Sequence, residues 1–180
     1  MRLKTAHAFP ACLLLAAAAA FAALAPAGAA PQARPNFAGT WELDQSRSHS
    51  VPPDMQQTMT VVQQGDQIAV ETKIVNKQGE RVIKDAYALD GKEAEFAPPA
   101  PPNAPKDAPP PKGKRTGRWM PNGKGFLVEE EVVNTTPKGP ETAIIARKWM
   151  TWPDGTISIE IITERGGNAF NNKRVFVKKQ

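Results

Sequence analysis

The sequence predicts an all-β fold, an antiparallel meander of strands closed into a small up-and-down barrel, with a β-sandwich as the alternative. Three observations predict it. Short segments alternate apolar and polar side chains with a period of two. Turn residues separate these segments at intervals of roughly 8–15 residues. Almost no helical periodicity occurs after the N-terminal segment, so helices are not expected to take part in the fold.

The N-terminal segment, residues 1–29, has the order of a secretory signal peptide. Two basic residues precede an apolar run at 11–24, and the small residues at 27–29 offer a cleavage site. The run is shorter than the roughly 20 apolar residues that cross a bilayer. We therefore expect an exported protein, periplasmic or extracellular, with no membrane span after cleavage and with a short linker at 30–36.

The mature chain has few side chains suited to catalysis or metal binding. The single cysteine, Cys12, and one of the two histidines, His7, lie in the signal peptide, which leaves His49 as the only imidazole. Disulfides, thiol chemistry and zinc–thiolate sites are thereby excluded from the mature protein. Lysine and arginine are spread along the chain among glutamates, so the mildly basic charge does not predict nucleic-acid binding.

Strands are predicted wherever the alternation is regular. In the segment 68–75, for example, Ile68, Val70 and Ile74 alternate with Glu71 and Lys73, which indicates a strand with one face in water. Glycine-containing turns, such as Asp90-Gly91, separate consecutive segments and favour hairpins. The predicted strands cover residues 37–43, 55–63, 68–75, 81–89, 92–97, 114–120, 125–134, 141–152, 156–164 and 173–178.

A proline-rich loop is predicted at residues 97–114, in a single β-barrel domain that covers 37–180. The loop holds eight prolines, which remove the N–H donors that a central strand needs. An extended, polyproline-like conformation follows. Such a segment can dock into an aromatic groove of a protein partner. It can also be a stiff spacer between two strands, which is the simpler interpretation.

The most informative string is Asn36-Phe37-Ala38-Gly39-Thr40-Trp41-Glu42-Leu43-Asp44. A glycine lets a closing strand bend, and the tryptophan two residues later can plug the end of a barrel. The string resembles the G-x-W opening of lipocalin and related calycin barrels. It is also similar to bacterial exported proteins that open with F-x-G-T-W-x-L-D-x-x-x-S, with Ser48 as the last residue. The resemblance implies a lipocalin-like barrel and supports fold more than function.

Three later strings resemble further elements of the same group, namely Arg118-Trp119, Asp154-Gly155 and Arg174-Val175-Phe176. The resemblance therefore extends over most of the mature chain, although the proline-rich loop lies outside it. The individual motifs are short and structural, and they assign no catalytic or binding role to any residue.

No catalytic or metal-binding set is predicted. A Ser-His-Asp set would have to use His49, which lies in a polar, serine-rich loop. The run Glu129-Glu130-Glu131 alternates its side chains on a strand, so a metal site is not expected and a solvated strand face is the better interpretation. The basic pair Lys173-Arg174 is likewise interpreted as part of a solvated last strand. We therefore expect no cofactor.

The aromatic residues Trp41, Tyr87, Trp119 and Trp149 are the candidates for lining a ligand cavity. They could equally fill the core, since small barrels are usually filled. The first functional hypothesis is an exported, non-enzymatic, lipocalin-like barrel that binds a small apolar ligand. The alternative is a protein-interaction module, in which the proline-rich loop at 97–114 binds a partner and the barrel is a solid scaffold.

Overall fold

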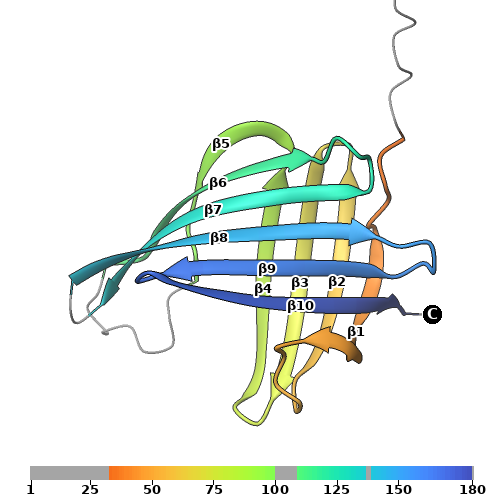
Figure 1. The fold of residues 1–180 in the computed structure, drawn as a ribbon, viewed down its shortest axis with the longest axis horizontal. Helices are drawn as coiled ribbons and strands as arrows, with labels where there is room; N and C mark the ends of the chain where they lie inside the picture. Colours follow the sequence, from red (N-terminus) through yellow and green to blue (C-terminus); the bar gives the residue numbers. More distant parts are fainter. Residues whose placement is uncertain (1–32, 100–108, 137–138, 180) are drawn as a thin grey trace, which may run out of the picture. The chain divides into compact units, whose positions relative to one another are not determined.

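The computed structural model describes residues 33–99, 109–136 and 139–179, and most of them belong to ten antiparallel β-strands (Figure 1). The strands are β1 (Gly39–His49), β2 (Gln56–Gln64), β3 (Gln67–Asn76), β4 (Gly79–Ala88), β5 (Asp90–Phe96), β6 (Lys112–Trp119), β7 (Gly125–Thr136), β8 (Gly139–Thr151), β9 (Ile157–Arg165) and β10 (Asn168–Lys178).

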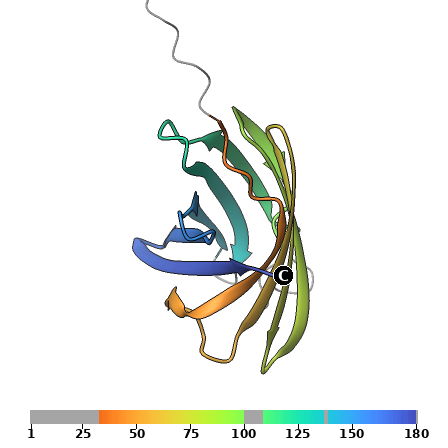
Figure 2. The ribbon, with the colours of Figure 1, turned by 90° about the vertical axis from the view of Figure 1, so that its right-hand side faces the viewer.

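All ten strands form one sheet in the order β4-β3-β2-β1-β10-β9-β8-β7-β6-β5. Each strand pairs with its neighbours in sequence, except that β4 and β5 are not hydrogen-bonded to each other, and β1 pairs with β10. The sheet curls into a nearly closed barrel whose opening lies between β4 and β5 (Figure 2). The predicted antiparallel barrel is confirmed, and the β-sandwich alternative is wrong because a sandwich requires two sheets.

At one end of the opening, the edge strand β4 lies against β6, the neighbour of the other edge strand β5. An ideal Cβ atom on Gly117 of β6 would lie 2.4 Å from the carbonyl oxygen of Ala88 in β4. The Arg115 guanidinium of β6 also donates a hydrogen bond to the carbonyl oxygen of Ala86, at 2.7 Å. Glycine at position 117 thus allows this close approach. The other end of β4, at Gly79, runs away from β6 (Figure 1).

Aromatic side chains fill one end of the barrel. Phe37, Phe126 and Phe176 are fully buried. The Phe126 ring stacks on Trp149 with centroids 5.1 Å apart, and Phe37 meets the Phe126 ring edge-on at 5.0 Å. Aromatic pairs in these geometries contribute about 0.5–1.5 kcal/mol beyond the area that they bury. This aromatic end is therefore a packed core with no room for a ligand among its rings.

The G-x-W motif lies in β1, where this strand pairs with β10 and so joins the first and last strands of the barrel. Trp41 is 4% exposed, and its Nε1–H donates a hydrogen bond of 2.9 Å to the carbonyl oxygen of Phe37. Gly39 has a φ of 136°, in the region that favours glycine, and an ideal Cβ atom there would lie 2.9 Å from Cε of Lys178. The motif therefore combines a glycine-dependent backbone conformation with a buried indole that is hydrogen-bonded.

Replacing Trp41 with phenylalanine tests the buried hydrogen bond. Phenylalanine keeps an apolar ring but leaves the Phe37 carbonyl without its donor, so we expect the free energy of unfolding to fall by about 1–3 kcal/mol. Urea denaturation measures this loss. The comparison is Trp152→Phe, at a half-exposed indole that donates a hydrogen bond of 2.9 Å to the Ser158 hydroxyl, for which a smaller loss of about 0.5–1 kcal/mol is expected. Equal losses in the two variants would contradict the expectation that the buried hydrogen bond of Trp41 stabilises the fold more than that of a half-exposed indole.

Asp44 and Ser48, which follow Trp41 in the same motif, form hydrogen bonds around an irregularity in the pairing of β1 with β10. The Asp44 carboxylate accepts hydrogen bonds from the backbone and hydroxyl of Ser46 and from the Arg47 side chain. The Ser48 hydroxyl donates to the Asp44 carbonyl oxygen at 2.6 Å and accepts the Val175 backbone N–H at 3.0 Å. These bonds span the register shift between β1 and β10, which explains how β1 continues beyond its predicted end at residue 43.

Asp44 gives the fold an expected dependence on pH. Hydrogen bonds from Ser46 and Arg47 lower the pKa of Asp44 to about 2. Because the folded pKa lies below the unfolded value of about 3.9, the stabilisation is present above pH 4 and is lost as the pH falls towards 2. We expect Asp44→Asn to reduce the acid-induced loss of stability by less than about 1 kcal/mol. Thermal denaturation at pH 6 and pH 2.5 measures it, and an unchanged difference would contradict the assignment.

A second strand boundary that differs from the prediction is the start of β10. The strand begins at Asn168, five residues before the predicted start at residue 173. Its first residues, through Asn172, show no apolar alternation, yet they pair one by one with β9. The signal peptide predicted at 1–29 and the centre of the proline-rich loop, 100–108, lie outside the described residues. Within the described part of the chain, no helix is long and apolar enough to cross a membrane.

Candidate functional site

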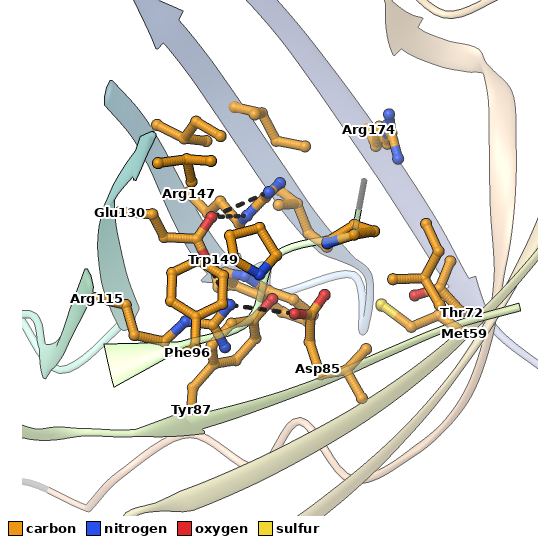
Figure 3. A pocket seen from close by; sticks show the side chains of 18 of the residues that line it. Met59, Thr72, Asp85, Tyr87, Phe96, Arg115, Glu130, Arg147, Trp149 and Arg174 are labelled. Carbon is orange, nitrogen blue, oxygen red and sulfur yellow. Dashed lines mark hydrogen bonds and ion pairs between the residues drawn. The ribbon is translucent and has the colours of Figure 1, made fainter. Parts of the chain in front are cut away.

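A cavity of about 280 Å³ lies inside the barrel, beside the aromatic end (Figure 3). Much of its wall is apolar and comes from strands on opposite sides of the barrel. The main apolar residues of the wall are Met59, Val70, Ile74, Ile83, Val132, Ile145, Ile159 and Ile161. The polar and charged ones are Gln57, Thr72, Asp85, Tyr87, Arg115, Glu130, Asn134, Arg147 and Arg174. An interior of this kind can hold a molecule with an apolar body and a polar group.

A buried ion cluster forms one part of the wall. Glu130 of β7 is 3% exposed and lies between two arginines, with Oε1 2.7 Å from Nη2 of Arg115 and Oε2 3.2 Å from Nη2 of Arg147. Arg115 and Glu130 are directly opposite each other in the β6–β7 register. Asp85 of β4 accepts a further bond from Arg115 at 3.2 Å. The cluster therefore links β4 to β6, β7 and β8 across the opening of the sheet.

Arg115 is held between two rings. Its guanidinium carbon lies 3.6 Å from the centroid of Phe96 and 5.0 Å from that of Tyr87. Cation–π contacts of this kind are strongest when the cation is shielded from water. Burial raises the pKa of the Tyr87 phenol above its usual value, so Tyr87 stays neutral at physiological pH. With carboxylates and rings around it, Arg115 has little freedom to move towards a ligand.

Arg174 of β10 has a different environment. Its guanidinium donates to the side-chain oxygen of Gln57 at 3.0 Å, and it forms no ion pair with any carboxylate of the described residues. In Figure 3 it stands apart from the cluster around Glu130. Burial lowers the pKa of Arg174 from its ordinary value, and the positive charges of Arg147 and Arg81 lower it further. A positive charge thus faces the cavity with only a neutral partner.

Three N–H donors in the cavity wall also lack a hydrogen-bond acceptor among the described residues. They are the Nε atoms of Arg115 and Arg174 and the indole Nε1 of Trp149. Buried donors are normally satisfied, and leaving one unpaired costs about 1–3 kcal/mol. Together with three arginines facing two carboxylates, these donors make the cavity wall suited to a ligand that carries acceptor oxygens and a negative charge.

The structure separates the four aromatic residues predicted from the sequence. Tyr87 and Trp149 line the cavity. Trp41 and Trp119 lie outside its lining and pack at the aromatic end, where the Trp119 indole donates to Asp66 at 2.8 Å. Because Trp149 also stacks on Phe126, it forms the boundary between the packed end and the cavity. The barrel interior is therefore filled at one end and hollow beyond it.

The charged residues of the cavity were missed by the sequence analysis. The interpretation of Glu129-Glu130-Glu131 as a solvated face is wrong for Glu130, which faces the interior, and right for its two exposed neighbours. The interpretation of Arg174 as part of a solvated strand is also wrong, because its guanidinium lines the cavity. The alternation of side chains along β7 indicates the inward position of Glu130, because Glu130 shares its face with Val128 and Val132.

His49 and the acidic residues form no metal site among the described residues. His49 is exposed at the end of β1 and is not among the residues that line the cavity. Over residues 33–99, 109–136 and 139–179, no three histidine, cysteine or acidic side chains converge as metal ligands would. Fold and site together define a ten-stranded antiparallel barrel with a partly hollow, positively charged interior.

Comparison with solved structures finds similar chains. The chain is similar to secretory abundant heat soluble protein 4 from Ramazzottius varieornatus, with 12% identity, a TM-score of 0.43, and 79% of this chain and 94% of that chain covered. It is also similar to zebrafish ileal bile acid-binding protein complexed with cholic acid, with 12% identity, a TM-score of 0.44, and 79% and 98% covered. No protein family and no curated protein sequence matches the chain.

Proposed function

We propose that this protein is a binding protein whose barrel interior holds a small amphipathic anion, a molecule with an apolar body and a carboxylate or similar headgroup. The observation that carries the proposal is Arg174, a guanidinium that faces an otherwise largely apolar cavity without an acidic partner. A charge removed from water without a counter-ion destabilises the fold. Its presence is explained if the counter-ion arrives with the ligand.

The rest of the wall supports an apolar body for the same ligand. Isoleucine, valine and methionine side chains surround the cavity, and burying apolar surface against them provides about 25 cal/mol for each Å². The volume of about 280 Å³ is at the lower end of the range of roughly 300–1,000 Å³ for small-molecule sites. A medium-chain acyl carboxylate therefore fits the chemistry better than a long-chain lipid.

Calorimetric titration with two matched probes tests the proposal. Decanoate and decan-1-ol have the same chain and differ in the charge of the headgroup. We expect decanoate to bind with one site per chain and at least about tenfold more tightly than decan-1-ol, because a hydrogen-bonded charge pair contributes more than a neutral hydrogen bond. Equal affinities, or no binding of either probe, would contradict the proposal.

We further propose that the protein acts outside the cytoplasm, on the basis of the signal-peptide pattern in residues 1–29. N-terminal sequencing of the protein recovered from the periplasm or medium of a bacterial host is expected to begin at Ala30. Retention of the full chain in the cytoplasm would contradict export and would leave the binding proposal unaffected.

A further inference from the structure

The sheet has two edges, and they are protected to different degrees. β5 is short, its register with β6 shifts between Asp90 and Glu93, and two prolines follow it closely. Irregularities and prolines of this kind block pairing with another strand. β4 has ten residues, pairs with β3 in continuous register from Gly79 to Ala88, and contains no proline. β4 therefore presents a regular edge that can accept another strand.

Among the described residues, only part of the β4 edge has no neighbouring strand. Near its C-terminal end, Arg115 donates to the Ala86 carbonyl oxygen, and Gly117 of β6 lies against Ala88. The side chain of Asp85 also reaches Arg115, but the backbone of the preceding segment, residues 79–85, runs away from β6 (Figure 1). Because successive residues of an edge strand point their backbone groups alternately inward and outward, and the Ala86 carbonyl faces β6, the even-numbered residues Glu80, Val82 and Lys84 present their N–H and C=O groups to the open side.

The outer face of this free segment is complementary to itself. Val82 is 50% exposed at its centre, with Glu80 and Lys84 two residues away on either side and also exposed. In an antiparallel pairing about Val82, each Val82 lies opposite its counterpart. Glu80 of each copy then lies opposite Lys84 of the other. The pairing uses residues whose backbone groups face the open side, and it ends at residue 85, before the β4 backbone meets β6 at Ala86.

Charges on the neighbouring strand extend this complementarity. Within one copy, Lys84 pairs with Glu71 of β3 at 3.1 Å, and Glu80 pairs with Lys73 of β3 at 2.9 Å. Pairing of two copies would place these side chains in a row of alternating sign across four strands. Opposite charges on facing strands stabilise a sheet, and like charges destabilise it.

We propose that two copies of this chain form a symmetric dimer by antiparallel pairing of residues 79–85 of β4 about Val82. The two sheets then join across the dimer axis. The contact involves seven residues of each copy, so the interface belongs to the small, reversible class that buries less than about 1,200 Å². The dimer is therefore expected to depend strongly on protein concentration. The side chains that meet across the dimer axis, those of Glu80, Val82 and Lys84, do not line the cavity, whereas Ile83 and Asp85 of the same segment do.

Sedimentation velocity of the purified protein tests the dimer. From about 10 μM to about 1 mM, we expect the weight-average mass of the wild-type protein to rise towards twice that of one chain. Lys84→Glu places glutamate opposite Glu80 of the second copy, and Glu80→Lys places two lysines together. Each variant alone is expected to raise the dissociation constant at least about fivefold, because two attractive pairs become repulsive.

Mixing the two variants provides the specific readout. In a mixed pair, both lysines of the Glu80→Lys chain face both glutamates of the Lys84→Glu chain, so association is expected to return to the wild-type level or above. The control is Lys148→Glu, which makes the same charge change on the outer face of β8 and is expected to leave association unchanged. A monomeric wild-type protein at about 1 mM, or a mixture that stays as dissociated as its parts, would overturn the proposal.

Discussion

Arg174→Met is expected to lower the affinity for decanoate at least about thirtyfold, while the affinity for decan-1-ol stays within about threefold of the wild-type value. Removing one partner of a shielded charge pair costs about 2 kcal/mol or more, and about 1.4 kcal/mol corresponds to tenfold in affinity. The alcohol has no charge for Arg174 to pair with, so its binding depends on the apolar wall. Calorimetry with both probes measures the difference.

The same variant is expected to keep or increase the stability of the ligand-free protein. Replacing a poorly paired, partly buried charge with an apolar side chain of similar length is neutral or stabilising in many proteins. Loss of binding together with unchanged or higher stability is a combination that a purely structural arginine would not produce. A loss of stability in Arg174→Met above about 1 kcal/mol would assign Arg174 to the support of the fold instead.

Two further variants control for this interpretation. Arg118→Met removes an arginine of the outer face of β6, where it pairs with Glu129, and is expected to leave decanoate binding unchanged. Arg174→Lys keeps a positive charge on a shorter, non-planar group and is expected to retain part of the preference for decanoate. If Arg118→Met weakens binding as much as Arg174→Met, the effect arises from overall charge and not from the cavity.

Glu130→Leu is expected to lower the free energy of unfolding by about 3–5 kcal/mol, as measured in urea. Glu130 is the carboxylate between Arg115 and Arg147, and its removal leaves positive charges close together in the interior. The control is Glu131→Leu, one residue further along β7 on the exposed face, where a change within about 0.5 kcal/mol is expected. Equal effects of the two substitutions would show that the interior cluster does not support the fold.

A double variant separates the charge imbalance from the loss of packing. In Glu130→Leu/Arg147→Leu, one of the uncompensated charges is removed together with the carboxylate. Residues in one ion network are coupled, so the double variant is expected to be more stable than the sum of the two single losses predicts. Additive losses would contradict the coupling between Glu130 and Arg147.

Much of the fold was predictable because side-chain alternation follows directly from strand geometry. Ile68, Val70 and Ile74 were expected on the face turned away from water, and all three are buried in β3. The start of β10 was not predictable in this way, because its first residues, 168–172, show no apolar alternation and are held by pairing with β9. Pairing between strands depends on backbone hydrogen bonds, which leave little trace in local sequence.

The candidate site was less predictable than the fold for two reasons. Arg147 lies between Ile145 and Trp149 on the inward face of β8, as the alternation of side chains indicates. Charged residues in strands are usually exposed, so the residue type by itself predicts the outward face. Large aromatic residues suit both a filled core and a cavity wall. Whether Trp119 or Trp149 borders the cavity depends on where the packed rings end, which is a property of the assembled barrel.

The pairing of β1 with β10 has a consequence for the order in which the protein can fold. The first and last strands of the barrel are neighbours at the centre of the sheet, and the sheet opens between β4 and β5. Before β10 is made, the chain can form only two separate meanders, β1–β4 and β5–β9. Contacts between distant parts of a chain slow folding. Closure of this barrel therefore has to wait until β10 has been made, so a chain that stops before β10 remains open.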